Sequence, residues 1–189
     1  VNGVIGGTGA QTTDNQSVVV ALISALTTFG TLPWTVDYSC DGTTAGSKGD
    51  AVNRITTNAK AVFSNAVTNA HSWIVLKQAG VTTGFEMLID CGTNVSNAGS
   101  HVRISFSYSA GFTGGSTISS PTATDQFWVG SASANDLGWL PTSSYTGRLH
   151  VLQSTDGKST RWFVCSNGVS NQIFILDAVP NATPGWTVP

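Results

Sequence analysis

The spacing of hydrophobic and polar residues changes once along this chain, near Pro33. Before that point, the apolar run Val18–Leu26 predicts one short helix, the only substantial helix of the chain. Asp14 or Ser17 would cap its start, and Gly30 followed by Pro33 would end it. The consecutive valines of the run would suit a strand equally well, because β-branched side chains favour extended backbone.

After Pro33 the pattern predicts short β-strands throughout, bounded by Gly, Asn, Ser and Pro. The stretch HVRISFSY alternates, with Val102, Ile104, Phe106 and Tyr108 on one face, which is typical of a half-buried antiparallel strand. The predicted strands are Trp34–Cys40, Ala51–Ile55, Ala61–Ser64, Ser72–Gln78, Phe85–Cys91, His101–Ser109, Gln126–Val129, Arg148–Ser154, Thr160–Cys165 and Gln172–Asp177.

Two hairpins are predicted near the C-terminal end. Asp156-Gly157 favours a type I′ turn, because Gly tolerates the positive φ that this turn needs, and Ser166-Asn167-Gly168 marks a second turn. Three consecutive antiparallel strands would therefore close the domain, which excludes a parallel α/β sheet. We predict an all-β fold, an antiparallel β-sandwich of jelly-roll type, with a closed barrel as the second choice. Residues 1–30 would form an N-terminal arm and the short helix, and residues 31–189 a single sandwich domain.

The first thirteen residues are rich in Gly and Thr and predict an extended arm. Their GVIGGTGA stretch resembles a dinucleotide-binding glycine loop, but such a loop must follow a strand and open a helix. This stretch begins the sequence with no strand before it, so the arm is the better interpretation.

Composition excludes several classes of function. Charged residues make up only 10% of the chain, the net charge is −2, and no cluster of Lys or Arg exists to neutralise phosphates, which argues against nucleic-acid binding. Ser17–Leu26 is too short to span a membrane, and no Lys or Arg precedes it as in a signal peptide. The neutral surface suits packing in an assembly, or service outside a cell.

The three cysteines, Cys40, Cys91 and Cys165, lie far apart in the sequence. Each sits within or beside an apolar strand-like run, so we predict three small buried hydrophobic residues. One disulfide and one free thiol remain the alternative if the protein matures outside the cytosol. No CxxC motif or histidine cluster suggests a metal.

No sequence motif indicates catalysis. The chain lacks a nucleophile elbow, a zinc-protease motif and a phosphate-binding loop, and its carboxylates are scattered singly. His71, His101 and His150 each sit next to a strand-like run and away from carboxylates in the sequence. We therefore predict a protein that is not an enzyme and that holds no cofactor and no metal.

The long loop Ser109–Asp125 is the most distinctive stretch of the chain. It is rich in Gly, Ser and Thr but contains two apolar anchors, Phe112 and Ile118, so we predict that it is ordered and laid over a surface suited to a protein neighbour. Trp139 and Trp186 lie in predicted loops and are further candidates for a protein interface. The tryptophans inside strand-like runs are predicted to lie in the core.

Several stretches together resemble a group of structural proteins of tailed bacteriophages. These are CDGTTAG, HSWIVLKQ, FEMLID, SAGFTGGSTISSPTATD, LHVLQSTDGKSTRWFVC and the final PGWTVP. The similarity covers the chain from about Thr31 to Pro189, and members of the group are described as virion proteins of the head surface or the tail. No catalytic residues are carried over from this group.

The resemblance implies a virion protein assembled in the cytoplasm of the bacterial host. Its expected role is capsid decoration, in which a cement protein binds the major capsid protein and stabilises the shell. A homo-oligomer is expected, and a trimer would suit the role. The N-terminal arm with Val4 and Ile5 would tether a neighbouring subunit. The alternative is a tail or fibre module that binds host glycan, which predicts exposed aromatic side chains.

Overall fold

The structure is a computed structural model that describes residues 2–7, 11–28, 33–78, 86–92, 103–107, 112–115, 117–119, 126–129, 145–153, 159–166 and 171–177. Within these ranges the chain forms antiparallel sheets and one α-helix. The predicted all-β antiparallel class is therefore confirmed at this level.

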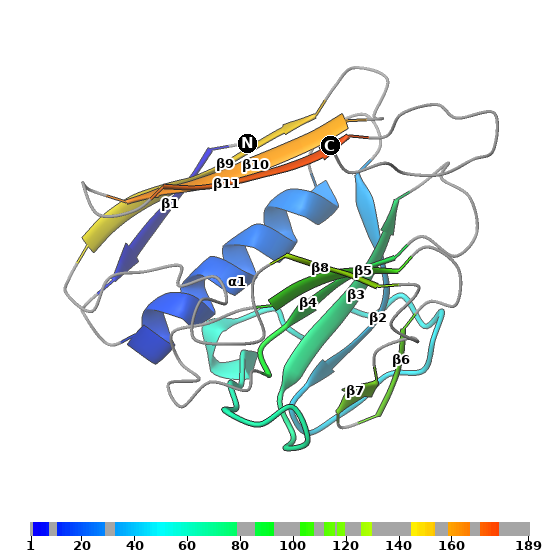
Figure 1. The fold of residues 1–189 in the computed structure, drawn as a ribbon. Coiled ribbons are helices and arrows are strands. Elements are labelled where there is room, and N and C mark those ends of the chain that lie inside the picture. Colours follow the sequence, from blue (N-terminus) through cyan, green and yellow to red (C-terminus); the bar gives the residue numbers. More distant parts are fainter. Residues whose placement is uncertain are drawn as a thin grey trace, which may run out of the picture.

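A five-stranded sheet carries the residues of the candidate site (Figure 1). All its pairings are antiparallel. In order across the sheet its strands are β2 (Trp34–Asp41), β3 (Ser72–Gln78), β4 (Glu86–Asp90), β5 (Arg103–Ser107) and β8 (Gln126–Val129). A separate ribbon pairs β6 (Thr113–Gly114) with β7 (Ile118–Ser119).

A four-stranded sheet contains the C-terminal strands. Its order is β1 (Asn2–Gly7), β9 (Tyr145–Gln153), β10 (Ser159–Ser166) and β11 (Asn171–Asp177). The antiparallel pairing of β9 with β10 and of β10 with β11 confirms the two predicted hairpins. The predicted turn residues Asp156, Gly157, Asn167 and Gly168 lie outside the described ranges.

The jelly-roll sandwich is not confirmed. In the described sheets, β2 to β5 and β9 to β11 are neighbours in the order in which they occur along the chain. That order is a meander, whereas a jelly roll is built from two Greek keys that bring strands from distant parts of the chain side by side.

Helix α1 (Gln11–Thr28) is the predicted helix, but it begins earlier than expected. Asp14 and Ser17 lie inside it, so neither residue caps its start. Its end at Thr28 agrees with the stop signal expected at Gly30. Near this end, the hydroxyl group of Thr28 donates a hydrogen bond of 2.7 Å to the carbonyl oxygen of Ser24, one turn earlier.

The helix lies between the two main sheets, contacting β1 and β9 on one side and β2 on the other (Figure 1). A sandwich in which the two sheets pack directly on each other is therefore not confirmed. The helix can fill the interior because its apolar stripe is broad, and only small or hydroxyl side chains such as Ser24 and Thr28 are exposed among its described residues. The buried side chains of the stripe are Val19, Leu22, Ile23, Ala25 and Leu26.

The N-terminal residues form a strand of the main fold. β1 pairs along its whole length with β9, so that Val4 lies opposite Arg148 and Ile5 opposite Gly147. The predicted extended conformation is confirmed for Asn2–Gly7, whose backbone pairs with its own chain, but residues 11–13 of the predicted arm lie in α1. The predicted boundary between residues 30 and 31 places β1 in the arm and β9 in the sandwich domain. In the structure the two strands belong to one sheet.

Two predicted strands are wrong. In Ala51–Ile55, Ala51 has a φ of 59°, in the left-handed region, which interrupts an extended ladder. The N–H group of Ala51 instead donates to the carbonyl oxygen of Asp37 at 3.0 Å, so this irregular segment lies over the edge of β2. In Ala61–Ser64, the N–H group of Val62 donates to the hydroxyl of Ser72 at 2.8 Å, and only Ser64 forms a β-bridge.

The core of the five-stranded sheet is buried on both of its faces. All five residues of β4 are buried, including Glu86 and Asp90 at its two ends. On β5, both Ile104 and Ser105 are fully buried, although alternate residues of a strand point to opposite faces. Burial of Ile104 agrees with the apolar face predicted for this strand, whereas burial of Ser105 on the other face contradicts a half-buried strand at that position.

We predict that Leu22→Ala lowers the free energy of unfolding by about 2–5 kcal/mol, because it leaves a cavity in the interior between the sheets. Leu22 has no exposed surface, whereas Ser24, about half a helical turn further on, is exposed. Ser24→Ala is the matched control and should change the free energy of unfolding by less than about 0.5 kcal/mol. Urea unfolding of both variants measures the difference, and equal effects would contradict the buried position of α1.

Candidate functional site

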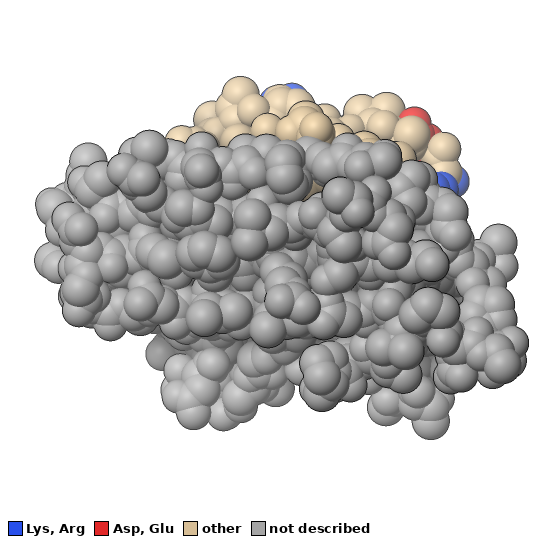
Figure 2. Space-filling model, turned by 90° about the horizontal axis from the view of Figure 1, so that it is seen from above, with Lys and Arg blue, Asp and Glu red and all other residues tan. Residues whose placement is uncertain are grey.

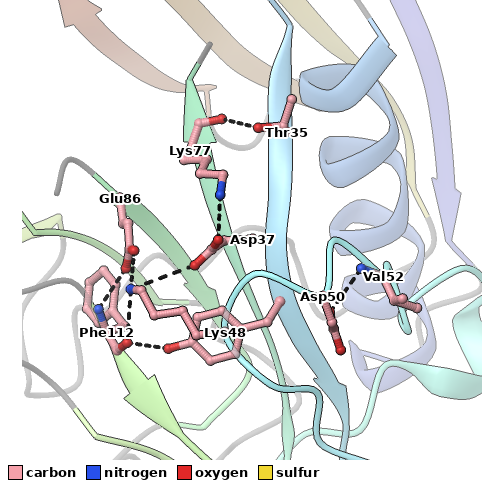
Figure 3. A network of polar contacts seen from close by, with 9 residues as sticks. Thr35, Asp37, Lys48, Asp50, Val52, Lys77, Glu86 and Phe112 are labelled. Atoms are coloured by element: carbon pink, nitrogen blue, oxygen red, sulfur yellow. Dashed lines mark hydrogen bonds and ion pairs between the residues drawn. The ribbon is translucent and has the colours of Figure 1, made fainter. Parts of the chain in front are cut away.

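The described residues bring two buried carboxylates together with two lysines, which we call the carboxylate–lysine network (Figure 3). Asp37 and Glu86 expose only 2% and 5% of their surface, whereas the side chains of Lys48 and Lys77 are about half exposed. Burial of a carboxylate is costly unless a cation and hydrogen-bond donors compensate its charge. Two negative and two positive groups make the network neutral.

A β-bulge places Asp37 in this network. Val36 pairs with Leu76 and Tyr38 pairs with Val75, so Asp37 is the extra residue of β2. A bulge lets one residue leave the regular alternation of the strand and turns its side chain to a new direction. As a result, the Asp37 carboxylate can reach lysines from two different segments.

Five segments meet at the network. Lys77 of β3 places its Nζ 2.7 Å from Asp37 Oδ1, and Lys48, in the turn after β2, places its Nζ 3.7 Å from Asp37 Oδ2. Lys48 Nζ also forms an ion pair with Glu86 Oε1. Glu86 Oε2 accepts the N–H group of Phe112 at 2.7 Å. The network therefore ties the long loop to β2, β3 and β4 (Figure 3).

Phe112 is anchored through its backbone and its side chain. While Glu86 accepts its N–H group, its carbonyl oxygen accepts a hydrogen bond from the hydroxyl of Tyr38. Burial, followed by the charges of Glu86 and Asp37, raises the pKa of Tyr38 far above its ordinary value, so the phenol stays protonated and able to donate. The side chain belongs to a buried apolar cluster, the Phe112 cluster, whose members are Tyr38, Cys40, Trp73, Val75, Leu88 and Phe112.

The β6–β7 ribbon covers this cluster. Tyr38 and Trp73 meet edge to face, with ring centroids 5.1 Å apart, and Ile118 of the ribbon packs against the cluster. The ribbon lies close to the indole ring, since a Cβ atom at Gly114 would be 3.0 Å from Trp73 Cζ2. A glycine at this position allows the ribbon to lie flat on the tryptophan.

The predicted loop Ser109–Asp125 is ordered over a surface in its described parts, 112–115 and 117–119, as expected. The surface, however, belongs to its own chain. Phe112 is fully buried in the Phe112 cluster, and Ile118 is partly buried against it, so the expectation that they anchor a protein neighbour is corrected. The apolar side chains of both residues pack within their own chain. The proposed interface residues Trp139 and Trp186 lie outside the described residues.

The sequence analysis did not single out the lysines of the network, and it treated Asp37 and Glu86 as scattered acidic residues. A signal was present, because both carboxylates occur inside apolar strand-like runs, WTVDYSC and FEMLID. A charged residue within a strand that is expected to be buried requires a partner. Which lysine supplies it depends on contacts between distant segments.

A shallow depression of about 330 Å³ adjoins the network, lined by Tyr38, Gly46, Ser47, Lys48, Phe112, Thr113 and Gly114. Its two aromatic rings are buried, and the ammonium group of Lys48 is already paired with carboxylates. Within the described ranges there is also no group of three or more His, Cys, Asp or Glu residues that could hold a metal ion. The arrangement is suited to fixing the loop in place and offers no free acid or base for chemistry.

His71 and Asp90 form a second buried pair that resembles a catalytic dyad. His71 Nε2 lies 2.7 Å from Asp90 Oδ1, but both side chains are fully buried. The other ring nitrogen, Nδ1, lies 2.6 Å from the carbonyl oxygen of Asn69. A general base needs a nitrogen that can reach the substrate, and here both nitrogens contact groups of the protein.

Cys40 and Cys91 are buried and form no disulfide, which confirms the prediction of small buried hydrophobic residues for these two positions. The side chain of Cys165 lies outside the described residues. Burial raises the pKa of Cys40, and burial together with the nearby charge of Asp90 raises the pKa of Cys91 well above its ordinary value. Both thiols are therefore held in the unreactive protonated form.

Comparison of the chain with protein-family models, with curated proteins and with solved structures finds no match in any of the three. No helix within the described ranges is both long and apolar enough to cross a membrane.

Glu86→Gln should lower the free energy of unfolding by about 1–3 kcal/mol, because the neutral amide cannot balance Lys48 and accepts the Phe112 N–H group more weakly. Asp50→Asn is the matched control: Asp50 pairs with Arg54 at 2.7 Å, but both side chains are partly exposed. That exposed pair should contribute less than about 1 kcal/mol. Chemical denaturation compares the two variants. A loss in Glu86→Gln no larger than in the control would contradict the anchoring role of Glu86.

At neutral pH, Cys40 and Cys91 should resist alkylation by iodoacetamide in the folded protein and react once the chain is unfolded in urea. The reason is that burial both blocks the reagent and disfavours the thiolate. Peptide mass spectrometry reads each cysteine separately, so the reactivity of Cys165 does not obscure the result. Rapid labelling of Cys91 in the native protein would show that the five-stranded sheet opens at the end of β4.

Proposed function

We propose that this protein is a structural protein of a tailed bacteriophage virion, and that it decorates the capsid as a cement protein without catalysis. The observation that carries the proposal is that the chain has few charged residues and pairs its described carboxylates internally. Each carboxylate whose side chain the structure describes has a partner inside the chain: Asp37, Asp41, Asp50, Glu86 and Asp90. Charged residues make up only 10% of the chain, and in Figure 2 the described residues on that side are mostly tan, with a few acidic and basic atoms.

A neutral surface supports assembly rather than action on a charged substrate. It provides no electrostatic field that would attract nucleic acid or steer a charged ligand. It can pack against an equally neutral protein lattice without leaving unpaired charges at the contact. The resemblance of the sequence to phage structural proteins identifies the proposed lattice as a shell built from the major capsid protein.

The proposed mechanism is mechanical. Each copy would bridge neighbouring capsid subunits, and rupture of the shell would have to break many such contacts at once. Weak contacts repeated over a symmetric lattice add up through multivalency. A homo-oligomer, such as a trimer, would match the symmetry of the lattice. This role needs a rigid body of antiparallel sheets and does not depend on the strand order of a jelly roll.

The thiols support the proposed place of assembly. Neither Cys40 nor Cys91 forms a disulfide, as expected for a protein that folds in the reducing cytoplasm of a bacterial host before it enters the virion. The tail or fibre module that binds glycan receives no comparable support. Sugar rings stack on exposed aromatic faces, and the only large hydrophobic side chains exposed among the described residues are Val52 and Val62.

The copy number in purified virions tests the proposal. Gel densitometry should give a number comparable to that of the major capsid protein, because a cement protein occupies repeated sites over the whole shell. A few dozen copies or fewer would contradict decoration and favour the tail or fibre. Virions that lack the protein should also release their DNA at a lower temperature than complete virions, and identical temperatures would contradict a stabilising role.

A further inference from the structure

The buried pair of His71 and Asp90 has a proton arrangement that can be deduced from its contacts. His71 directly precedes β3, and Asp90 is the last residue of β4. Nδ1 of the imidazole lies 2.6 Å from the carbonyl oxygen of Asn69, and Nε2 lies 2.7 Å from Asp90 Oδ1. Both side chains are completely shielded from water.

Both neighbours of the imidazole are hydrogen-bond acceptors. A backbone carbonyl oxygen cannot donate, so the nitrogen facing Asn69 must carry a hydrogen. Asp90 Oδ1 accepts the N–H group of Gly92 at 2.8 Å, which favours an ionised carboxylate, and a nitrogen that faces an ionised carboxylate carries a hydrogen as well. A neutral imidazole has only one N–H group. The lone pair of its other nitrogen would then face a lone pair of an oxygen atom, and at these distances the two would repel each other.

We propose that His71 is a permanently charged imidazolium in the folded protein, and that its pairing with Asp90 makes the fold lose stability as the pH rises above neutrality. The pair is then a buried ion pair that connects the start of β3, the end of β4 and the segment before β3. It adds a pH-dependent element to a fold whose other described ion pairs all involve lysine or arginine.

The imidazole ring has no room to turn away from these partners. A Cβ atom placed on Gly92 would lie 2.5 Å from both Cε1 and Nε2 of His71, so the ring rests directly against the backbone of Gly92. The segments on either side are joined by the β-bridge between Ser64 and Gly92. The close fit holds the ring in the orientation in which both nitrogens meet oxygen atoms.

The charged and titratable groups of the neighbouring strands agree with an ionised Asp90. The fully buried thiol of Cys91 follows it in the chain, and its pKa is raised well above the ordinary value by burial and then by the Asp90 charge, so this thiol stays neutral. Arg103 occupies the position opposite Asp90 on β5. Asp41 lies opposite Ser72 on β2, where its carboxylate accepts the N–H groups of its own turn.

On the segment before β3, Lys60 is the charged residue. Its side chain is exposed, and its carbonyl oxygen accepts the hydroxyl of Ser72 at 2.7 Å. Among the described groups around the imidazole, therefore, Asp90 is the only one that supplies an adjacent negative charge to it.

The direction of the pH effect follows from counting protons. In the unfolded chain a histidine has a pKa of about 6.5 and an aspartic acid of about 3.9. Above about pH 6.5 the unfolded chain releases the histidine proton that the folded protein keeps, so stability falls as the pH rises. Below about pH 3.9 the unfolded chain binds a proton that the ionised Asp90 does not, so stability also falls as the pH drops. The contribution of the pair is greatest between these values.

Nitrogen-15 NMR of the imidazole groups in the full-length folded protein tests the assignment directly. One of the three histidines should show two protonated ring nitrogens that persist at a pH about two units above the ordinary histidine pKa of about 6.5. Contacts to Asn69 and Gly92 in the same spectra identify it as His71. A single protonated nitrogen on His71 at neutral pH would overturn the proposal, whether the missing proton is absent or resides on Asp90.

Stability measurements provide the second test. In the wild-type protein, the unfolding equilibrium constant should rise by up to tenfold between about pH 7 and pH 8, which is the effect of one proton retained on folding and lies below the range in which unfolded cysteines release their protons. His101→Gln and His150→Gln are the control variants and should keep this dependence, whereas His71→Gln should lose it. A wild-type protein without this dependence, or a control variant that loses it, would overturn the proposal. The NMR result decides the matter if His71→Gln does not fold.

Discussion

The need to compensate two buried carboxylates organises the five-stranded sheet. β4 is buried along its entire length and carries a carboxylate at each end, Glu86 and Asp90. Neither charge can remain in the interior without partners, because transfer of an unpaired carboxylate out of water costs more than the whole stability of a typical domain. Distant segments must therefore come to β4, and the chain reaches its compact form only when they do.

The two ends of β4 recruit different partners. At Glu86, Lys48 and the backbone of Phe112 bring in the turn after β2 and the long loop. At Asp90, His71 and the N–H group of Gly92 fix the approach to β3. The apolar clusters supply most of the stabilisation, whereas these directional contacts decide which segment covers which part of the sheet. Specificity and stability thus come from different groups of atoms.

Many of the strands could be predicted from the sequence because buried strands are rich in apolar residues, either alternating or in short continuous runs. Runs such as SWIVLKQ show which residues form a strand, whatever their partners are. The position of α1 could not be predicted, because an apolar stripe does not say whether one sheet or two will cover it. The failure at Ala51–Ile55 has a local cause, since the left-handed backbone of Ala51 leaves no hydrophobic signal.

The candidate site was harder to predict than the fold. The distinctive loop and its two apolar anchors could be identified, but whether Phe112 contacts its own chain or another depends on contacts with Tyr38 and Trp73, which are far away in the sequence. The bulge at Asp37 also has no signature in the apolar pattern, although it changes which side chains share a face. Long-range geometry of this kind appears only when the strands are paired.

The long loop leaves and re-enters the five-stranded sheet at two paired positions. Ser107, the last residue of β5, is the partner of Gln126, the first residue of β8. A change in the length of the segment between them would therefore leave the register of both strands unaltered, whereas one added residue inside β4 would exchange its two faces. Evolution can thus remodel this part of the molecule freely in length, provided that a residue able to take the place of Phe112 is retained.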